Sequence, residues 1–231
     1  MRLPDQWVWD SWVADDGTDY HLFFLMAPRA LEDRSRRHLA ARVGHAVAHD
    51  LVDWDYRGEC FGPSDASFDD LAIWTGSVVR DGARWRMFYT ALSTAGHHIF
   101  DQRVGSAVSD DLHHWTRSSS EPALRVDGRW YKTLANTPGA RTTGPDLEGS
   151  SETWRDPAVL PDPDGAGWHL FVTAGVSRPD ATTTASSRTP PARTSPPGPW
   201  DRPCATRRGV RPARGAPKRR RRRTSRPRVH L

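Results

Sequence analysis

Val8-Trp9-Asp10-Ser11-Trp12 opens the pattern that decides the fold, because that pattern occurs three times along the 231 residues. In the first copy, a turn containing Gly17 and an apolar run, residues 20–27, follow this stretch. The second copy covers residues 74–91 and the third covers residues 154–174; each has a leading Trp, an Asp-Gly turn and an apolar run. Asp-Gly between two β-rich runs indicates a hairpin, since it tolerates the positive φ of a tight primed turn. The sequence therefore predicts three β-hairpins of the same kind.

A second repeated element follows the first two hairpins. Residues 42–54 and 103–115 are identical at eight of their thirteen positions, including an Asp-Leu pair and a closing Trp. Each unit thus contains a hairpin, a third strand and a turn, and units of about four strands are typical of propeller blades. An array of β-sandwich domains is the alternative, but its repeats are longer and its turns are spaced differently. We expect an all-β fold in which residues 1–177 form two and a half propeller blades.

Charge divides the chain near Val176. Residues 1–177 hold 17 Lys and Arg against 26 Asp and Glu (17 − 26 = −9), whereas residues 178–231 hold 16 against 2 (16 − 2 = +14). Ten of the 19 prolines also lie in the second part. A segment of this composition cannot bury enough apolar surface to offset its chain entropy. We therefore expect residues 178–231 to form a disordered basic tail.

Two interpretations of this tail are open. The run Lys218–Arg223 is typical of a patch that binds nucleic acid or an anionic surface. However, Arg/Pro/Ala/Thr-rich peptide is also what GC-rich coding DNA yields out of frame, and a shifted reading of residues 180–198 can spell the missing third-strand repeat. We favour the frameshift, and the negative charge of residues 1–177 gives no support to a nucleic-acid partner.

The remaining composition excludes several classes of protein. Residues 1–6 contain no apolar signal region and no stretch approaches 18 apolar residues, so we expect a cytoplasmic protein without a membrane span. Cys60 and Cys204 suggest no disulfide framework. No His/Cys/Asp cluster has ligand spacing, so we expect neither a metal site nor a cofactor; the pairs at 97–98 and 113–114 are interpreted as loop and strand-end histidines.

The candidate site residues follow the leading Trp of each hairpin. This position differs among the copies, with Asp10 in the first, Thr75 in the second and the pair Arg155-Asp156 in the third. A repeated scaffold whose inner strands each bring a different polar group to one pocket has this pattern. Indoles stack on sugar faces and carboxylates act on glycosidic bonds, so a sugar site is predicted. The nearby indoles belong to Trp9, Trp12, Trp74 and Trp154.

Each of these residues also has an ordinary structural interpretation. A single Trp is more often packed between blades than bound to a sugar, and Asp10 can serve as a turn residue. Asp156 can simply pair with Arg155. The alignment of the three repeats favours the functional interpretation for both carboxylates.

At these positions the sequence resembles a known clan. Residues 8–12 are similar to the nucleophile motif of family 68 glycoside hydrolases, the levansucrases, which corresponds to the Asn-Asp-Pro-Asn motif of family 32, the β-fructofuranosidases. Residues 74–77 resemble their Trp/Phe-Ser-Gly-Ser segment, with Thr75 for the usual Ser, and residues 154–157 resemble their Arg-Asp-Pro motif. The three motifs stand in family order between residues 7 and 174.

The resemblance implies a five-bladed propeller with a fructosyl site on its axis, and a substrate such as sucrose or a fructan. It assigns Asp10 as the nucleophile of a retaining double displacement and Asp156 as the transition-state stabiliser that binds fructose hydroxyls. Trp9, Trp74, Thr75 and Arg155 would line the sugar subsite, and the indole of Trp12 is expected beside them.

The resemblance also requires an acid/base Glu downstream of the Arg-Asp-Pro motif. The chain has no Glu after Glu152, so this group is absent and we expect little or no turnover from the chain as written. Two alternatives to a fructosidase remain. One is a pentose-active hydrolase of the family 43 type, which shares the clan fold and usually inverts. The other is an inactive carbohydrate-binding propeller remnant.

Overall fold

The computed structural model describes residues 1–31, 33–65, 67–94, 102–133, 153–163 and 167–175. The expected disordered and out-of-frame tail, residues 178–231, and its boundary at residue 177 lie outside the described residues, as do Glu148, Glu152 and the turn at 164–165. None of the helical turns within the described ranges is long and apolar enough to cross a membrane.

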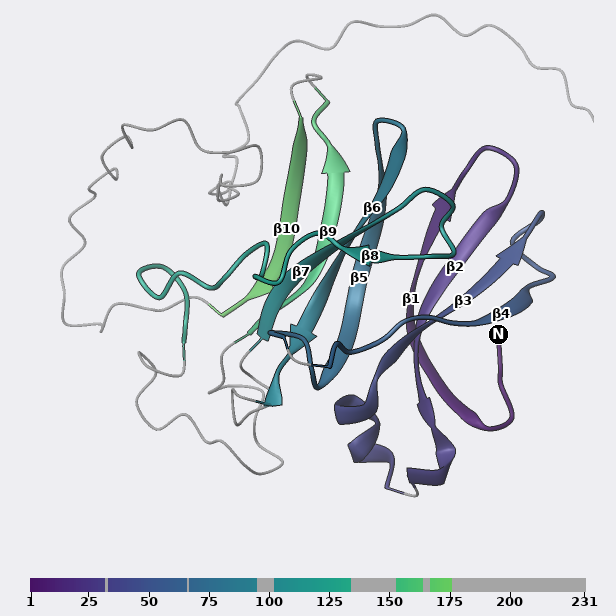
Figure 1. Ribbon diagram of the computed structural model, residues 1–231, viewed down its shortest axis with the longest axis horizontal. Helices are drawn as coiled ribbons and strands as arrows, with labels where there is room; N and C mark the ends of the chain where they lie inside the picture. Colours follow the sequence, from purple (N-terminus) through teal and green to yellow (C-terminus); the bar gives the residue numbers. More distant parts are fainter. Residues whose placement is uncertain (32, 66, 95–101, 134–152, 164–166, 176–231) are drawn as a thin grey trace, which may run out of the picture.

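The described residues form three antiparallel sheets (Figure 1). The first sheet has the order β1-β2-β3-β4, the second has the order β5-β6-β7-β8, and the third is the hairpin β9–β10. Two 3-10 turns, η1 (Arg29–Leu31) and η2 (Arg34–Ala40), connect β2 to β3. The strand bounds are β1 (Gln6–Asp15), β2 (Tyr20–Pro28), β3 (Arg42–Ala48), β4 (Asp55–Phe61), β5 (Ala72–Asp81), β6 (Arg84–Leu92), β7 (Gln102–Ser109), β8 (Thr116–Arg117), β9 (Trp154–Pro161) and β10 (Trp168–Ala174).

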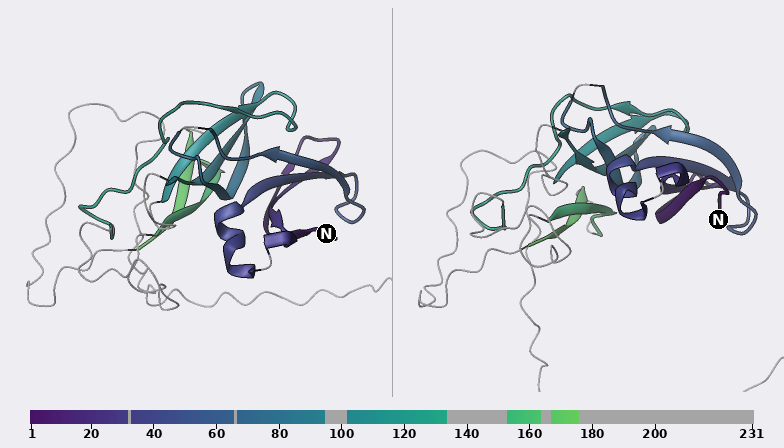
Figure 2. Two further views of the ribbon diagram at one scale, coloured as in Figure 1. Left: turned by 60° about the horizontal axis from the view of Figure 1, so that its bottom comes forward. Right: turned by 90° about the horizontal axis from the view of Figure 1, so that it is seen from below.

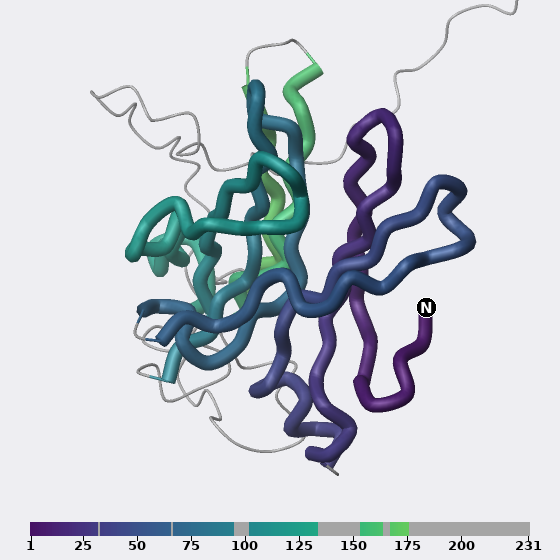
Figure 3. The backbone as a smooth tube through the Cα atoms, turned by 45° about the vertical axis from the view of Figure 1, so that its right-hand side comes forward, coloured from purple at the N-terminus to yellow at the C-terminus, as the bar shows by residue number. Residues whose placement is uncertain are grey.

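The three sheets lie side by side, and their first strands are neighbours. β5 contacts both β1 and β9, and the turns β1–β2 and β5–β6 lie at the same end of the molecule as the end of β9 and the start of β10 (Figures 1 and 3). Figure 2 shows from two further sides that the sheets are not closed into a ring. Two four-stranded sheets and one hairpin are two and a half blades, so the predicted all-β partial propeller and its three hairpins are confirmed.

The repeated Asp-Leu turn has the same backbone geometry in both complete blades. The carboxylate of Asp50 accepts hydrogen bonds from the backbone N–H groups of residues 52 and 53, and that of Asp111 accepts them from residues 113 and 114. The next residue, Leu51 or Leu112, has a φ of 64° in each case. Asp caps its own turn in this way because its short side chain reaches the following amides. The sequence identity of residues 42–54 and 103–115 thus corresponds to one local structure used twice.

Apolar side chains fill the space between neighbouring sheets. Phe23 of β2, Ile73 of β5 and Met87 and Tyr89 of β6 belong to one buried cluster between the first two sheets. A second cluster, containing Phe88 and Trp154, joins the second sheet to the β9–β10 hairpin. The sheets are therefore held face to face by burial of apolar area.

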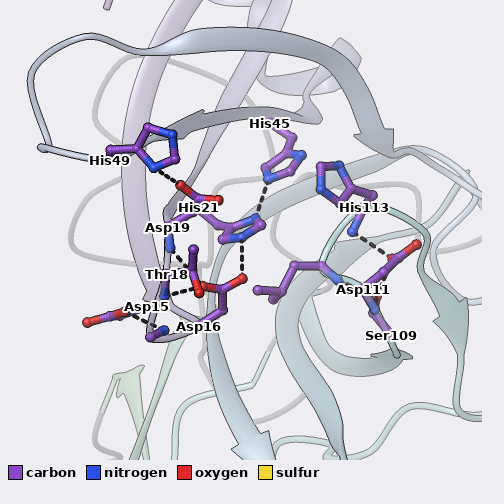
Figure 4. Close-up of polar contacts among 12 residues, drawn as sticks. Asp15, Asp16, Thr18, Asp19, His21, His45, His49, Ser109, Asp111 and His113 are labelled. Carbon is purple, nitrogen blue, oxygen red and sulfur yellow. Dashed lines mark hydrogen bonds and ion pairs between the residues drawn. The ribbon is translucent and has the colours of Figure 1, made fainter.

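A group of histidines joins the first two blades near the hairpin turns (Figure 4). His21 of β2 and His45 of β3 are both buried, and their Nδ1 and Nε2 atoms lie 3.0 Å apart. His113, from the connection between β7 and β8, places its ring edge-on against both imidazoles, with centroids 5.5 and 4.7 Å away. His113 is thus a loop residue, as the sequence suggested, but it is half-buried and packs between the blades instead of being exposed.

Candidate functional site

Each of the three inner strands is irregular at its candidate residue. The pairing of β1 with β2 shifts between Trp9 and Ser11, so that Asp10 is left out of the register. The pairing of β5 with β6 shifts in the same way around Thr75, and that of β9 with β10 shifts between Arg155 and Ala158. A bulge of this kind turns a side chain out of the regular alternation of a strand, and bulges are frequent beside active sites.

Both candidate carboxylates occur on backbone that L-residues rarely adopt. The φ angle is 38° at Asp10 and 56° at Asp156. Asp tolerates this region better than most residues, yet such positions still cost free energy and persist only where the surrounding structure holds them. At Asp10 and Asp156 the backbone therefore departs from regular strand pairing, and this departure changes the direction in which each carboxylate points.

Hydrogen bonds connect the three bulges. The Oγ1 of Thr75 donates to Oδ2 of Asp10 at 2.9 Å, across the boundary between the first two blades. The Oγ1 of Thr90 donates to the carbonyl oxygen of Thr75 at 3.1 Å and accepts a bond from the backbone N–H of Asp156 at 2.9 Å. Asp10, Thr75 and Asp156, which lie up to 146 positions apart (156 − 10), are thus brought into one connected group.

The electrostatics of this group differ between its carboxylates. Burial raises the pKa of Asp156, and the nearby negative charge of Asp10 adds to this effect. The charge of Arg155, whose Nε lies 3.6 Å from Oδ2 of Asp156, opposes the rise, as do hydrogen bonds from Thr173 and Thr75. Because a Thr hydroxyl has a single proton, it can donate to only one carboxylate at a time. Thr75 therefore stands between two carboxylates that compete for its proton.

The predicted indoles separate into two groups. Trp9 and Trp74 are half-buried and lie in one cluster near the inner strands. Trp12 packs instead against the core between the first two sheets, with its ring stacked on Phe23 at a centroid distance of 6.1 Å. Trp154 is 7% exposed and contacts Tyr131 in the second core cluster. The structure thus brings Trp9 and Trp74 together with the polar group and places Trp12 and Trp154 in packing positions.

One residue beside the indoles was missed by sequence reasoning. His38 of η2 lies edge-on to Trp9 and to Trp74, with ring centroids 5.9 and 5.8 Å apart, and its carbonyl oxygen accepts a hydrogen bond of 2.7 Å from Nε1 of Trp74. It belongs to a segment between the repeated elements, so no motif or spacing pointed to it. Its neighbour Arg37 was missed for the same reason.

Two surface hollows lie elsewhere. One, of about 290 Å³, is lined by residues that include Asp19, His49 and Arg57; the other, of about 410 Å³, is lined by residues that include Gly17 and Trp85. Neither is lined by the residues that the three bulges present. Within the described ranges, no group of three or more His, Cys, Asp or Glu side chains is arranged to hold a metal ion.

Comparisons with solved structures show the same architecture in larger proteins. The chain is similar to inulosucrase from Halalkalicoccus jeotgali bound to kestose (21% identity, TM-score 0.59, 80% of this chain and 47% of that one). It is also similar to fructan 1-exohydrolase IIa from Cichorium intybus (22%, 0.55, 74% and 28%) and to RS223 β-xylosidase (13%, 0.51, 72% and 43%). At these identities the likeness concerns the fold, and the chain spans less than half the length of each.

A comparison with curated protein sequences finds no match. The model of the N-terminal domain of glycosyl hydrolases family 32, however, matches residues 12–184. This range contains Thr75, Arg155 and Asp156, whereas Asp10 lies just before it. Because the match covers three quarters of the chain and follows the same propeller architecture, the chain belongs to glycosyl hydrolases family 32 through its N-terminal domain.

Proposed function

We propose that this chain carries the nucleophile and the fructosyl-binding half of a retaining glycosidase that acts on fructosyl linkages of sucrose or fructans. Asp10 is the nucleophile in this proposal, and Asp156 accepts hydrogen bonds from the hydroxyls of the bound fructose. Arg155 and Thr75 orient the two carboxylates, and Trp9 and Trp74 border the sugar. The observation that carries the proposal is the meeting of Asp10, Thr75 and Asp156 at three bulges on three inner strands.

In the first chemical step, a carboxylate oxygen of Asp10 forms a bond to the anomeric carbon of the fructosyl unit. The bond from this carbon to the leaving oxygen breaks, and the leaving group needs a proton from a second carboxyl group. Asp156 is not that acid in this proposal, because it is assigned to the fructose hydroxyls; burial raises its pKa and the charge of Arg155 opposes that rise. Glu148 and Glu152 lie outside the described residues, and no Glu follows them. We therefore propose that turnover of natural substrates by this chain is very slow.

A substrate that needs no general acid tests the nucleophile directly. β-Fructofuranosyl fluoride loses fluoride ion together with the bonding pair, so attack by Asp10 alone can form the covalent fructosyl-protein. We expect release of one equivalent of fluoride and a mass increase of one fructosyl unit, located at Asp10 by peptide mapping. Asp10→Asn should abolish both signals, whereas Asp15→Asn, an exposed carboxylate on the same strand, should leave them unchanged. Absence of any adduct on the unmodified chain would refute the proposed mechanism.

The same experiment separates the alternatives. An inverting hydrolase of the family 43 type activates water instead of forming a covalent intermediate, so it gives no adduct; an intact relative would release arabinose or xylose rather than fructose. The similarity to a β-xylosidase fold is the observation that keeps this candidate open. A carbohydrate-binding remnant would bind sucrose without forming an adduct, and Asp10→Asn would leave its affinity nearly unchanged.

A further inference from the structure

The 3-10 turn η2 (Arg34–Ala40) reaches from the first blade to the second. It packs against β2 of its own sheet and against β5 of the next. Its start is fixed by Asp33, whose Oδ1 accepts a hydrogen bond of 2.8 Å from the backbone N–H of Ser35. Arg37 and His38 are half-buried, whereas Arg36 and Leu39 on either side of them are exposed. The turn therefore presents two consecutive side chains to the interior and their neighbours to solvent.

His38 holds the two indoles that border the proposed sugar site. Its ring lies edge-on to both Trp9 and Trp74, with interplanar angles of 77° and 68°, and its carbonyl oxygen fixes Nε1 of Trp74. Edge-to-face contacts of this kind give each ring a preferred orientation. Burial and the charge of Arg37 lower the pKa of His38, against the opposing charge of Asp10, and so favour the neutral imidazole between the indoles. Trp9 and Trp74 belong to different blades, so His38 also fixes their spacing.

The guanidinium of Arg37 lies over the ring of Trp9, one of the two indoles that His38 contacts. Its Cζ is 5.3 Å from the ring centroid of Trp9, and it interacts electrostatically with Asp10. Nη1 makes a long contact of 3.4 Å with the carbonyl oxygen of Arg34, while the buried Nε has no hydrogen-bond partner within the described part of the chain. That Nε is shielded by the protein, so a bound sugar would meet the terminal NH2 groups of this half-buried guanidinium instead. A guanidinium that lies beside an indole face and a carboxylate is suited to a bound sugar, because a sugar stacks on the indole and accepts hydrogen bonds at its hydroxyl oxygens.

We propose that η2 forms one wall of the sugar site, in which Arg37 donates hydrogen bonds to hydroxyl oxygens of the bound fructosyl unit and His38 is the positioning residue for Trp9 and Trp74. This assignment rests on the proposed function, since it names contacts within the same site. It adds a ligand contact and a specificity element outside the three inner-strand motifs.

The test measures sucrose binding by isothermal titration calorimetry, which needs no turnover. Loss of a hydrogen bond from a charged donor should raise the Kd for sucrose roughly tenfold or more in Arg37→Ala. Arg36→Ala, the exposed neighbour, is the matched control and should bind as the unmodified chain does. His38→Ala should weaken binding and abolish the sucrose-induced change in tryptophan fluorescence. His38→Phe, which keeps an aromatic edge between the indoles, should restore both, a recovery that a loss of general stability would not show.

The possible failures are distinguishable. If the unmodified chain binds sucrose and Arg37→Ala binds it equally well, the assignment of Arg37 is overturned while the proposed function stands. If His38→Phe behaves as His38→Ala although both unfold at the temperature of the unmodified chain, the positioning role is overturned. If the unmodified chain neither binds sucrose nor forms the fructosyl adduct, the proposed function fails and this assignment fails with it.

Discussion

The hydroxyl of Thr75 donates a hydrogen bond of 2.9 Å to Oδ2 of Asp10 and so joins the inner strand of the second blade to that of the first. The donor comes from one bulge and the acceptor from another, and the same hydroxyl can donate to Asp156 instead, where it favours the ionised form. The two carboxylates therefore depend on one side chain for their relative orientation.

Thr75→Val tests this dependence, because valine keeps the shape of threonine and removes the donor. A hydrogen bond to a charged acceptor contributes about 1.5–3 kcal/mol, so the rate of fluoride release from β-fructofuranosyl fluoride should fall about tenfold or more. Thr75→Ser keeps the hydroxyl and should retain most of the rate. A Val variant that reacts as fast as the unmodified chain would show that Thr75 does not orient the nucleophile.

Much of this arrangement could be predicted from the sequence. The Asp-Gly turns and the apolar runs are local signals, so the three hairpins and the two and a half blades followed from them. Alignment of the repeats also selected the positions at which the inner strands bulge, since a residue that varies within a repeated scaffold is free to serve a site. Neither inference required knowledge of long-range contacts.

Two kinds of contact could not be predicted. One is set by how deeply a side chain is buried, and the other is made by residues outside the repeated segments. Trp9 and Trp12 are three positions apart and look equivalent, yet Trp12 lies beyond the bulge, where the sheets pack closely on Phe23. Arg37 and His38 belong to residues 29–41, which match nothing in the second copy. Their position beside Trp9 and Trp74 results from the path of η2, which no periodicity encodes.

A buried polar network in the second blade gives a stability prediction. Asp69 is completely buried, and its Oδ2 accepts hydrogen bonds of 2.8 Å from the hydroxyl of Tyr89 and 2.7 Å from Nε of Arg117. Asp69→Asn leaves the guanidinium without its charge partner, which costs about 3–5 kcal/mol in buried pairs. The free energy of unfolding in urea should fall accordingly. Asp70→Asn is the control, since the partners of Asp70 within the described residues are the uncharged Thr94 and Ser93; a loss of the same size there would contradict this explanation.

The equivalent leucines of the two Asp-Leu turns should respond in opposite directions to the same substitution. Both have a φ of 64°, but Leu51 is 49% exposed and Leu112 is 1% exposed. Leu51→Gly relieves the strain of the left-handed backbone but also gives the unfolded chain more conformational freedom. The first effect is the larger, so the fold should become more stable by about 0.5 kcal/mol. Leu112→Gly also removes a buried side chain, so a net loss of about 2–4 kcal/mol is expected. Thermal unfolding of the two variants measures the difference, and a common sign would contradict the assigned strain or the assigned burial.

The histidines between the blades should make stability fall in mild acid. Burial, with the neighbouring His113, His21 and Arg57, lowers the pKa of His45 to about 3, and the charge of Asp111 opposes this only in part; Asp16 faces His21 from the β1–β2 turn. The unfolded chain binds a proton at His45 below its ordinary pKa of 6.5, whereas the folded chain does not. Stability contributed by the neutral imidazole is therefore complete above pH 6.5 and is lost as the pH falls from there toward 3, by up to about 1.4 kcal/mol per pH unit.

Burial is the main cause of this low pKa, and the contact between Nδ1 of His21 and Nε2 of His45, in which one nitrogen must donate and the other accept, lies at the same buried position. Protonation of both rings would leave two N–H groups facing each other. His45→Gln remains neutral, so its urea midpoints between pH 7 and pH 4.5 should decline less steeply than those of the unmodified chain. His49→Gln changes an exposed imidazole that pairs with Asp19 and should preserve the original slope. Parallel pH profiles for the unmodified chain and His45→Gln would show that this inter-blade contact does not sense protonation.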